Sequence, residues 1–259
     1  MSGFEKHDDT AKRFFVSLTE PLEQFPADIE VTDDIVVHHL RTVMRARTGE
    51  SVVIVDGQRG QAYAAVLQDL QKHSVSLRVQ RKLETLKTVL PQAVLAVALI
   101  KEQRWDWLLQ KATELGVHTI QPLLADRTVI RLGDKDISKK LERWQAVLRS
   151  AAEQSEGLFI PQIMPPLSTN AYLGQMQSNT LKLILRERGE HRQSLKQALK
   201  GFQTEQAAIF AIGPGGGWTD SELDAFEQAG FLPVSLGTRI LRSETAAVAA
   251  MAALVYEFT

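Results

Sequence analysis

Hydrophobic and polar positions follow a β-type pattern in the first third of the chain. Up to about residue 84, hydrophobic residues come in short runs that are separated by turn-forming residues. The three clearest runs cover residues 51–56, 62–70 and 74–79, with a glycine-containing turn at 57–60. Short strands joined by tight turns predict a small β-barrel or β-sandwich.

Beyond residue 93 the pattern changes to buried-type strands that alternate with amphipathic helices. The predicted strands cover residues 93–100, 117–124, 181–185, 207–212 and 232–236. The predicted helices cover residues 104–115, 137–155, 192–200, 220–229 and 243–257. This alternation predicts the α/β class, with a mainly parallel sheet covered on both faces. We therefore expect two domains, a β-rich domain over residues 1–84 and an α/β domain over residues 85–259, with a charged linker at 84–89.

One predicted helical segment interrupts the first region, around residues 38–46. His38, Arg41 and Arg45 recur there at i, i+3 and i+7, and Arg47 follows directly. Cations on one stretch of surface suit contacts with RNA phosphates, but they equally suit a helix face that is merely solvated. The pattern alone gives the two interpretations equal weight.

Composition and charge narrow the classes of function. The 259 residues carry a formal net charge of −1, so nucleic acid would have to be bound by a local basic patch. Cysteine is absent, which excludes disulfides and thiolate metal sites, and no HExxH-type spacing indicates a metal. The charged start and the lack of an uncharged apolar run of ~20 residues predict a cytoplasmic protein that does not enter a membrane.

The stretch most suggestive of ligand binding is GPGGGWTD at residues 213–220, between a predicted strand and a predicted helix. Consecutive glycines let backbone N–H groups approach a ligand closely. Thr219 or Asp220 is the expected N-cap, with Glu222 in the first helical turn. The stretch does not match a dinucleotide fingerprint, which would lie near the first strand of the α/β region. It does not match a phosphate loop either, because such a loop would end in Gly-Lys-Ser/Thr. A purely structural turn stays open as an interpretation.

A second strand-to-helix junction, LGTRILRSETAA, covers residues 236–247. Ser243 or Thr245 is the candidate N-cap of the helix that follows, and the small residues after it allow close packing. Arg242 and Glu244 bring charge to this junction. They suit a binding site, or else a surface ion pair that contributes little to stability.

Several motifs then occur together in one order. They are HLRTVMRARTGE at 39–50, VDG at 55–57, LLQKATELGVHTIQPLLADRTV at 108–129, AAEQS at 151–155 with Ile160 and Pro161, IGPGGG at 212–217, and LGTRILRSETA at 236–246. In this order they resemble the 16S rRNA uridine N3-methyltransferase family. The resemblance extends over nearly the whole chain.

The resemblance implies an RNA-binding, PUA-like β-barrel over residues 1–84. It implies a SPOUT-superfamily methyltransferase domain over residues 85–259, whose C-terminal part forms a trefoil knot. In that family S-adenosylmethionine lies bent in the knot, with its adenine held largely by backbone groups. The implied partners are a second copy of the chain, in a homodimer with sites near the subunit interface, and 16S rRNA, free or within the small ribosomal subunit.

Site residues follow from the same resemblance. Arg242 is expected to stabilise the anionic base, and Glu244 to remove the N3 proton or position the substrate. Arg41, Arg45 and Arg47 are the expected RNA contacts, and no metal is expected. The expected S-adenosylmethionine contacts are Leu185, Ile212, Gly213, Pro214, Gly216, Gly217, Leu236, Gly237, Ile240, Leu241 and Thr245.

The chain departs from the family at one visible position. The common glycine motif of the family is GPEGG, and Gly215 stands here in place of the glutamate. This loss keeps open an RNA-binding protein of the same fold with weakened catalysis. An unrelated oxidoreductase that holds a dinucleotide with the glycine loop is the second alternative.

Overall fold

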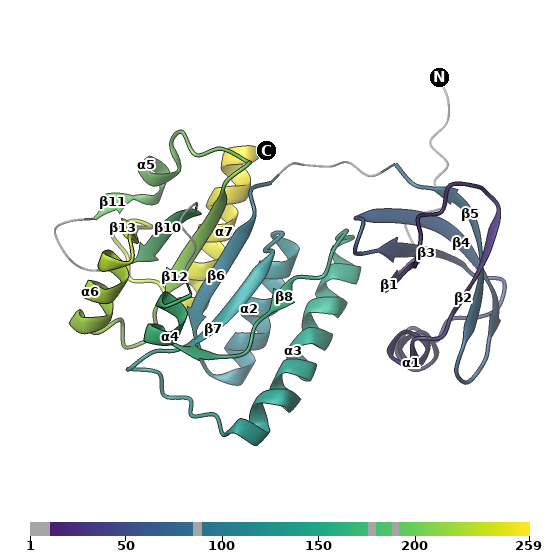
Figure 1. Cartoon of the computed structure of the whole chain (residues 1–259), viewed down its shortest axis with the longest axis horizontal. Helices are drawn as coiled ribbons and strands as arrows, with labels where there is room; N and C mark the ends of the chain where they lie inside the picture. Colours follow the sequence, from purple (N-terminus) through teal and green to yellow (C-terminus); the bar gives the residue numbers. More distant parts are fainter. Residues whose placement is uncertain (1–10, 85–89, 176–179, 188–191) are drawn as a thin grey trace. The chain divides into compact units, whose positions relative to one another are not determined.

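The structure, a computed structural model, describes residues 11–84, 90–175, 180–187 and 192–259. The chain forms two compact units (Figure 1). The first unit contains residues 1–87 together with 152–160, and the second contains residues 88–151 and 161–259. The predicted linker at 84–89 lies, apart from Glu84, outside the described residues. The predicted division between residues 84 and 85 therefore stays a prediction.

The first unit is built on a five-stranded sheet with strand order β1-β3-β4-β5-β2. The β1 and β3 strands run parallel and the other neighbours run antiparallel. The strands are β1 (Lys12–Val16), β2 (Ala27–Val31), β3 (Ser51–Asp56), β4 (Gln61–Leu70) and β5 (Val75–Lys82). Alternate positions of these strands bury one core, in which Phe14, Ile54 and Leu77 are at most 1% exposed. The small β-rich unit expected from the sequence is confirmed.

The helical segment of the first unit differs from the predicted one at 38–46. The α1 helix (Asp34–His38) begins earlier, because the Asp33 side chain accepts a hydrogen bond from the Ile35 N–H, and α1 continues into the π-helical η1 (His39–Val43). Arg41 lies on η1, whereas Arg45 comes after it in a left-handed conformation with φ 50°. The helix face predicted from i, i+3 and i+7 spacing therefore ends before Arg45.

Residues 152–160, the end of α3 and the segment that follows, pack within the first unit. Ala152 lies in a buried cluster with Phe15 and Val55. The Glu153 carboxylate, 3.1 Å from His39 Nε2, adds a polar contact. These contacts assign a stretch distant in sequence to the β-rich unit, which strand and helix patterns do not indicate.

The second unit contains an eight-stranded sheet in which all strand pairs are parallel. Its order is β11-β13-β10-β12-β6-β7-β8, and β9 also pairs with β7. The strands are β6 (Ala93–Ala98), β7 (Thr119–Leu124), β8 (Gln162–Ile163), β9 (Leu167–Ser168), β10 (Thr180–Leu185), β11 (Gln193–Ser194), β12 (Ala207–Ile212) and β13 (Leu232–Ser235). The predicted α/β class with a mainly parallel sheet is confirmed.

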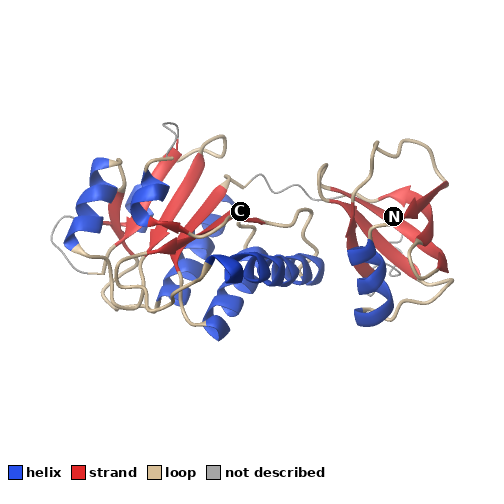
Figure 2. Cartoon of the chain, turned by 60° about the horizontal axis from the view of Figure 1, so that its bottom comes forward, coloured by secondary structure: helices blue, strands red, loops and turns tan. Residues whose placement is uncertain are grey.

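Helices cover both faces of this sheet (Figures 1 and 2). They are α2 (Glu102–Glu114), α3 (Asp134–Gln154), α4 (Thr169–Leu173), α5 (Leu195–Leu199), α6 (Asp220–Gln228) and α7 (Ser243–Phe258). The α7 helix packs on β6 and β12 beside α2. On the other face, Tyr172 of α4 and Phe226 of α6 share a buried cluster with Ile209 and Ala211 of β12. No helix in the described part of the chain is both long and apolar enough to cross a bilayer.

Some elements are shorter than predicted or were missed. The predicted helix at 192–200 is only the five-residue α5, which begins after Ser194 with a capping box to Gln197. The two-residue strands β8, β9 and β11 were not predicted, because two residues contain no measurable periodicity.

Candidate functional site

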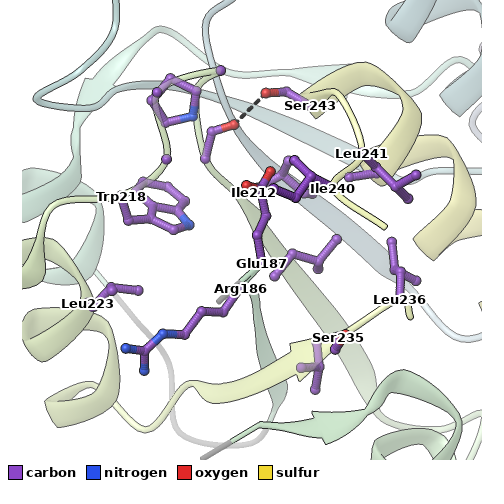
Figure 3. A pocket seen from close by; sticks show the side chains of 18 of the residues that line it. Arg186, Glu187, Ile212, Trp218, Leu223, Ser235, Leu236, Ile240, Leu241 and Ser243 are labelled. Atoms are coloured by element: carbon purple, nitrogen blue, oxygen red, sulfur yellow. Dashed lines mark hydrogen bonds between the residues drawn. The ribbon is translucent and has the colours of Figure 1, made fainter. Parts of the chain in front are cut away.

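The carboxyl ends of β10, β12 and β13 surround a cavity of about 520 Å³, termed the first cavity (Figure 3). These three strands are neighbours in the sheet. In open parallel sheets, loops at the carboxyl ends of the strands form the ligand sites. Trp218 and Leu223 lie on one side of the first cavity, and Leu236 and Leu241 lie on the other.

The glycine loop, residues 213–217, forms one wall through its backbone. A Cβ on Gly213 would lie 3.1 Å from the Trp218 ring, and one on Gly216 would lie 3.4 Å from Arg127 Cβ. Gly217 has φ 74°, a conformation that favours glycine. Close packing at Gly213 and Gly216 and the backbone conformation at Gly217 therefore explain three of the glycines, which line the first cavity with main-chain atoms.

The buried carboxylate of Glu222 connects the glycine loop with two other segments. Glu222 is 4% exposed and accepts hydrogen bonds from the Asp126 N–H (3.0 Å), the Thr169 hydroxyl (2.9 Å) and the Thr219 N–H (3.0 Å). Thr219 is the N-cap of α6 and forms a capping box with Glu222. Of the two caps expected, Thr219 or Asp220, Thr219 is the one observed, and it also holds the end of the glycine loop in place.

Arg127, in the loop after β7, supports the glycine loop from outside. Its Nη1 donates to the Gly216 carbonyl at 3.0 Å and to the Trp218 carbonyl at 3.2 Å. These bonds cross 89 and 91 positions of sequence. The conformation of the glycine loop therefore depends on a loop from another strand.

The opposite wall comes from the segment before α7 and from the first turn of that helix. Ser243 is 6% exposed, and its hydroxyl donates to the Gly213 carbonyl at 2.7 Å (Figure 3). The N-cap of α7 is Arg242, whose side chain makes no capping bond. The expectation that Ser243 or Thr245 caps this helix is therefore wrong. Ser243 instead joins the two walls of the first cavity.

The first cavity brings together most of the residues expected to contact the cofactor. Those that line it are Leu185, Ile212, Gly213, Pro214, Gly216, Gly217, Leu236, Gly237, Ile240 and Leu241. Thr245 is exposed on α7 and is not among the lining residues, whereas Ser243 and Ala246 are. Residues three apart share a helix face, so Ser243 and Ala246 both line the first cavity, whereas Thr245 lies on another side of α7. The predicted cofactor contact of Thr245 stays a prediction.

Sequence reasoning missed several lining residues. They are Arg127, Arg186, Glu187, Trp218, Asp220, Leu223, Val234, Ser235, Arg239, Ser243, Ala246 and Gly215, which stands in place of the family's glutamate. Arg186 and Glu187 directly follow the predicted strand at 181–185, so the rule that ligands bind at carboxyl ends could have selected them. Arg127 had no such signal, because its role depends on which strands are neighbours.

A second cavity, of about 380 Å³, lies at the carboxyl ends of β6, β7 and β12 and at the start of α7. Both predicted catalytic residues, Arg242 and Glu244, line it. Glu244 is 8% exposed, and its Oε1 lies 3.7 Å from Nε of Arg104 on α2. Glu244 is therefore buried beside Arg104, and the interpretation of Glu244 as half of a solvent-exposed ion pair with Arg242 does not hold.

The predicted RNA-contacting residues lie in the first unit. Arg41, Arg45 and Arg47 are all exposed, and Arg41 Nη1 donates to the Lys72 carbonyl at 3.4 Å. Within the described residues, no group of three or more His, Asp or Glu side chains is placed to hold a metal ion.

The chain matches two family models. Residues 88–255 match the RNA methyltransferase domain, and residues 32–80 match the RNA methyltransferase PUA domain. The two matches fall on the α/β part and on the β-rich part of the chain, respectively.

Curated relatives and solved structures agree with these matches. The ribosomal RNA small subunit methyltransferase E of Bacillus subtilis is 30% identical to this chain. The aligned region covers 95% of this chain and 96% of the Bacillus subtilis protein. Its counterpart in Synechocystis sp. is 35% identical over 83% of this chain and 69% of its own. The crystal structure of the enzyme from Neisseria gonorrhoeae, bound to S-adenosyl methionine, has a TM-score of 0.80 at 33% identity and covers 96% of this chain and 98% of its own. This chain therefore belongs to the RNA methyltransferase family, with a methyltransferase domain and the PUA domain that accompanies it.

Proposed function

We propose that this chain transfers a methyl group from S-adenosylmethionine to N3 of a uridine in 16S rRNA. The observation that carries the proposal is the first cavity, with its glycine backbone wall at the carboxyl edge of the parallel sheet. The Neisseria gonorrhoeae relative of the same fold binds S-adenosyl methionine, and the curated relatives are ribosomal RNA small subunit methyltransferases.

The residues of the first cavity fit this cofactor. Its volume of about 520 Å³ lies within the usual range for small-molecule sites, about 300–1,000 Å³. Ile212, Leu236 and Leu241 offer apolar surface for the adenine, and the glycine loop offers main-chain groups. Arg186 and Arg239 provide positive charge for the carboxylate of the methionine part. Polar and apolar groups are thus both present where a nucleoside joined to an amino acid needs them.

Methylation of N3 requires the removal of a proton, because N3 of uridine is protonated at neutral pH. S-adenosylmethionine, when bound, supplies the methyl group on a sulfonium and leaves as S-adenosylhomocysteine. The N3 proton passes to the Glu244 carboxylate, and the N3 electron pair forms the new bond to the methyl carbon. The Arg242 guanidinium stabilises the negative charge on the base while the bond forms. A positioned acid–base group typically contributes about 10²–10⁴-fold to the rate.

Neither alternative from the sequence is favoured. The glycine loop is not left unsupported at Gly215, since hydrogen bonds from Arg127 to the Gly216 carbonyl and from Ser243 to the Gly213 carbonyl hold the loop on either side of it. The glycine loop follows β12, late in the chain, and not the first strand of a nucleotide-binding unit. A weakened enzyme predicts that Gly215→Glu restores a rate that the wild type lacks.

The decisive experiment is methyl transfer to 16S rRNA that lacks the modification. Reverse transcription is expected to stop at the product, because a methyl group on N3 blocks the pairing edge of the base. Arg242→Ala and Glu244→Ala are expected to lower kcat about 10²-fold or more and to leave S-adenosylhomocysteine binding within about threefold in calorimetry.

Two outcomes would contradict this proposal. If the wild-type chain transferred no methyl group to 16S rRNA, the proposed activity would be contradicted. Binding of NAD in place of S-adenosylhomocysteine would favour the oxidoreductase. Comparison of free 16S rRNA with the small subunit as substrate tells which form is the partner.

The proposal includes a homodimer. The outer faces of α2 and α7 carry exposed aromatic residues, with Trp107 41% and Tyr256 84% exposed. Large exposed apolar side chains on neighbouring helices suit a protein contact. Light scattering coupled to size-exclusion chromatography is expected to give twice the chain mass of 28.9 kDa, and Tyr256→Glu is expected to shift it towards one chain.

The proposal also assigns RNA binding to the first unit. The exposed Arg41, Arg45 and Arg47 are expected to contact phosphates, and each loss should weaken binding without a change in sequence preference. Cytoplasmic location follows for an enzyme whose partner is the ribosomal RNA.

A further inference from the structure

The second cavity is adjacent to the first along the same edge of the parallel sheet. The first lies at the ends of β13, β10 and β12, and the second lies at the ends of β12, β6 and β7. Gly215, Gly216 and Arg127 line both cavities. The two cavities therefore border each other, and a molecule in the second would lie beside one in the first.

Positive charge gathers around the second cavity. Four cations line it against two carboxylates, although the whole chain has a net charge of −1. The cations are Lys101, Arg104, Arg127 and Arg242. An excess of cations at a cavity in a slightly acidic protein indicates an anionic ligand.

Apolar side chains complete the lining and remain open to solvent. Val129 is 85% exposed and Ile240 is 57% exposed, and both line the second cavity. Large apolar side chains that flank a cavity provide surface for a flat, partly apolar ring. Cations together with apolar walls match a nucleotide, which joins a base to phosphate groups.

The start of α2 provides two cations that line the second cavity, where a phosphate could reach them. Lys101 is the N-cap of this 13-residue helix and Arg104 lies in its first turn. Arg104 is 49% exposed, and both residues line the second cavity. The positive end of the helix dipole adds to their charge. Arg127, by contrast, is held by the Gly216 and Trp218 carbonyls.

We infer that the second cavity receives the target nucleotide of the RNA, and that Lys101 and Arg104 bind the phosphate groups that flank it. This inference rests on the proposed function and adds to it the residues that bind the acceptor. Arg104 also lies 3.7 Å from Glu244, so it faces the group that accepts the N3 proton. Phosphate binding would then bring the uridine to the proton acceptor and to the side of the second cavity that borders the first.

The test compares Arg104→Gln and Lys101→Gln with Lys111→Gln. Lys111 is a cation of the same helix whose ammonium pairs with Glu114 at 2.7 Å, away from the cavity. Arg104→Gln is expected to raise KM for 16S rRNA about tenfold and to leave Kd for S-adenosylhomocysteine within about twofold. It should also reduce the slope of log binding constant against log salt by about one. Lys111→Gln should match the wild type.

Arg104 could instead act only by positioning Glu244, and measurements in the Glu244→Gln background distinguish this role from phosphate binding. There, phosphate binding predicts that Arg104→Gln still reduces the salt slope, whereas a purely positioning role predicts no further change. An Arg104→Gln variant that behaves like Lys111→Gln in KM and in salt slope would overturn the inference. Failure of the wild type to methylate 16S rRNA would remove the proposed function instead, while the salt slopes would still decide whether Arg104 binds RNA.

Discussion

Gly213 and Gly215 belong to the same loop, but their surroundings make opposite demands. A Cβ on Gly213 would meet the Trp218 ring at 3.1 Å, whereas a Cβ on Gly215 would meet no atom within 4 Å. Trp218 has little room to yield, because it packs edge-on against Phe226 with ring centroids 4.8 Å apart. Glycine is therefore required at position 213, whereas position 215 has room for a side chain.

This contrast predicts the effect of adding one methyl group. Gly213→Ala is expected to displace Trp218 and to raise Kd for S-adenosylhomocysteine about tenfold, since overpacking a tight site costs about 1–3 kcal/mol. Calorimetric titration measures the effect. Gly215→Ala, the matched control in the same loop, should bind within about twofold of the wild type. Equal losses in both variants would mean that the steric contact with Trp218 is not what shapes the site.

At the scale of elements, Glu222 connects three segments that are distant in sequence. Its carboxylate accepts bonds from the loop after β7, from the first residue of α4 and from the N-cap of α6. Asp126 and Glu222 are 96 positions apart. A single buried carboxylate therefore fixes the exit of the glycine loop with respect to two neighbouring strands.

Removal of this carboxylate is expected to destabilise the second unit. Glu222→Ala leaves buried donors without an acceptor and removes the capping box, and together these cost about 2–4 kcal/mol. Thermal unfolding should show a Tm lower by roughly 5–15 °C. Asp224→Ala, at an exposed position of the same helix, should change stability by less than about 0.5 kcal/mol. Similar Tm values for both variants would contradict the role given to Glu222.

At the scale of the whole molecule, burial of one histidine makes stability depend on pH. The half-buried His118, directly before β7, accepts a hydrogen bond from the Ala93 N–H at 3.4 Å. Burial disfavours the charged ring and lowers the pKa of His118 from 6.5, although a hydrogen bond with Gly116 opposes this. Below pH 6.5 the unfolded chain therefore takes up a proton that the folded chain resists.

The sign of the effect follows from this difference in proton uptake. The contribution of His118 to stability is complete above pH 6.5 and declines as the pH falls below that value, towards the lowered pKa of the folded state. Urea unfolding at pH 7.5 and pH 5.5 measures it. The wild type should lose more unfolding free energy between these two pH values than His118→Gln does. An equal loss in both would show that another group dominates.

Local sequence predicted much of the second unit because its elements are long and strongly patterned. The β12 strand was predicted with its observed bounds, and the apolar runs of β6 and α7 were found within two residues at each end. The Thr219 cap was among the two that local chemistry offered. Isolated short elements such as β8 and α4 were beyond reach, because tertiary pairing rather than periodicity stabilises them.

The sequence by itself determined the two-part organisation and the α/β class, since both follow from local periodicity. Through motifs that resemble a known family it also supplied the glycine wall and fewer than half of the residues that line the first cavity. Only the tertiary structure decided that Arg127 holds the glycine loop, that Ser243 joins the two walls of the first cavity and that Arg104 faces Glu244. These contacts depend on β12 pairing with β6 and on α7 packing against α2. The physical reason is that side chains far apart in sequence meet only after the order of the strands is fixed, and no local pattern contains that order.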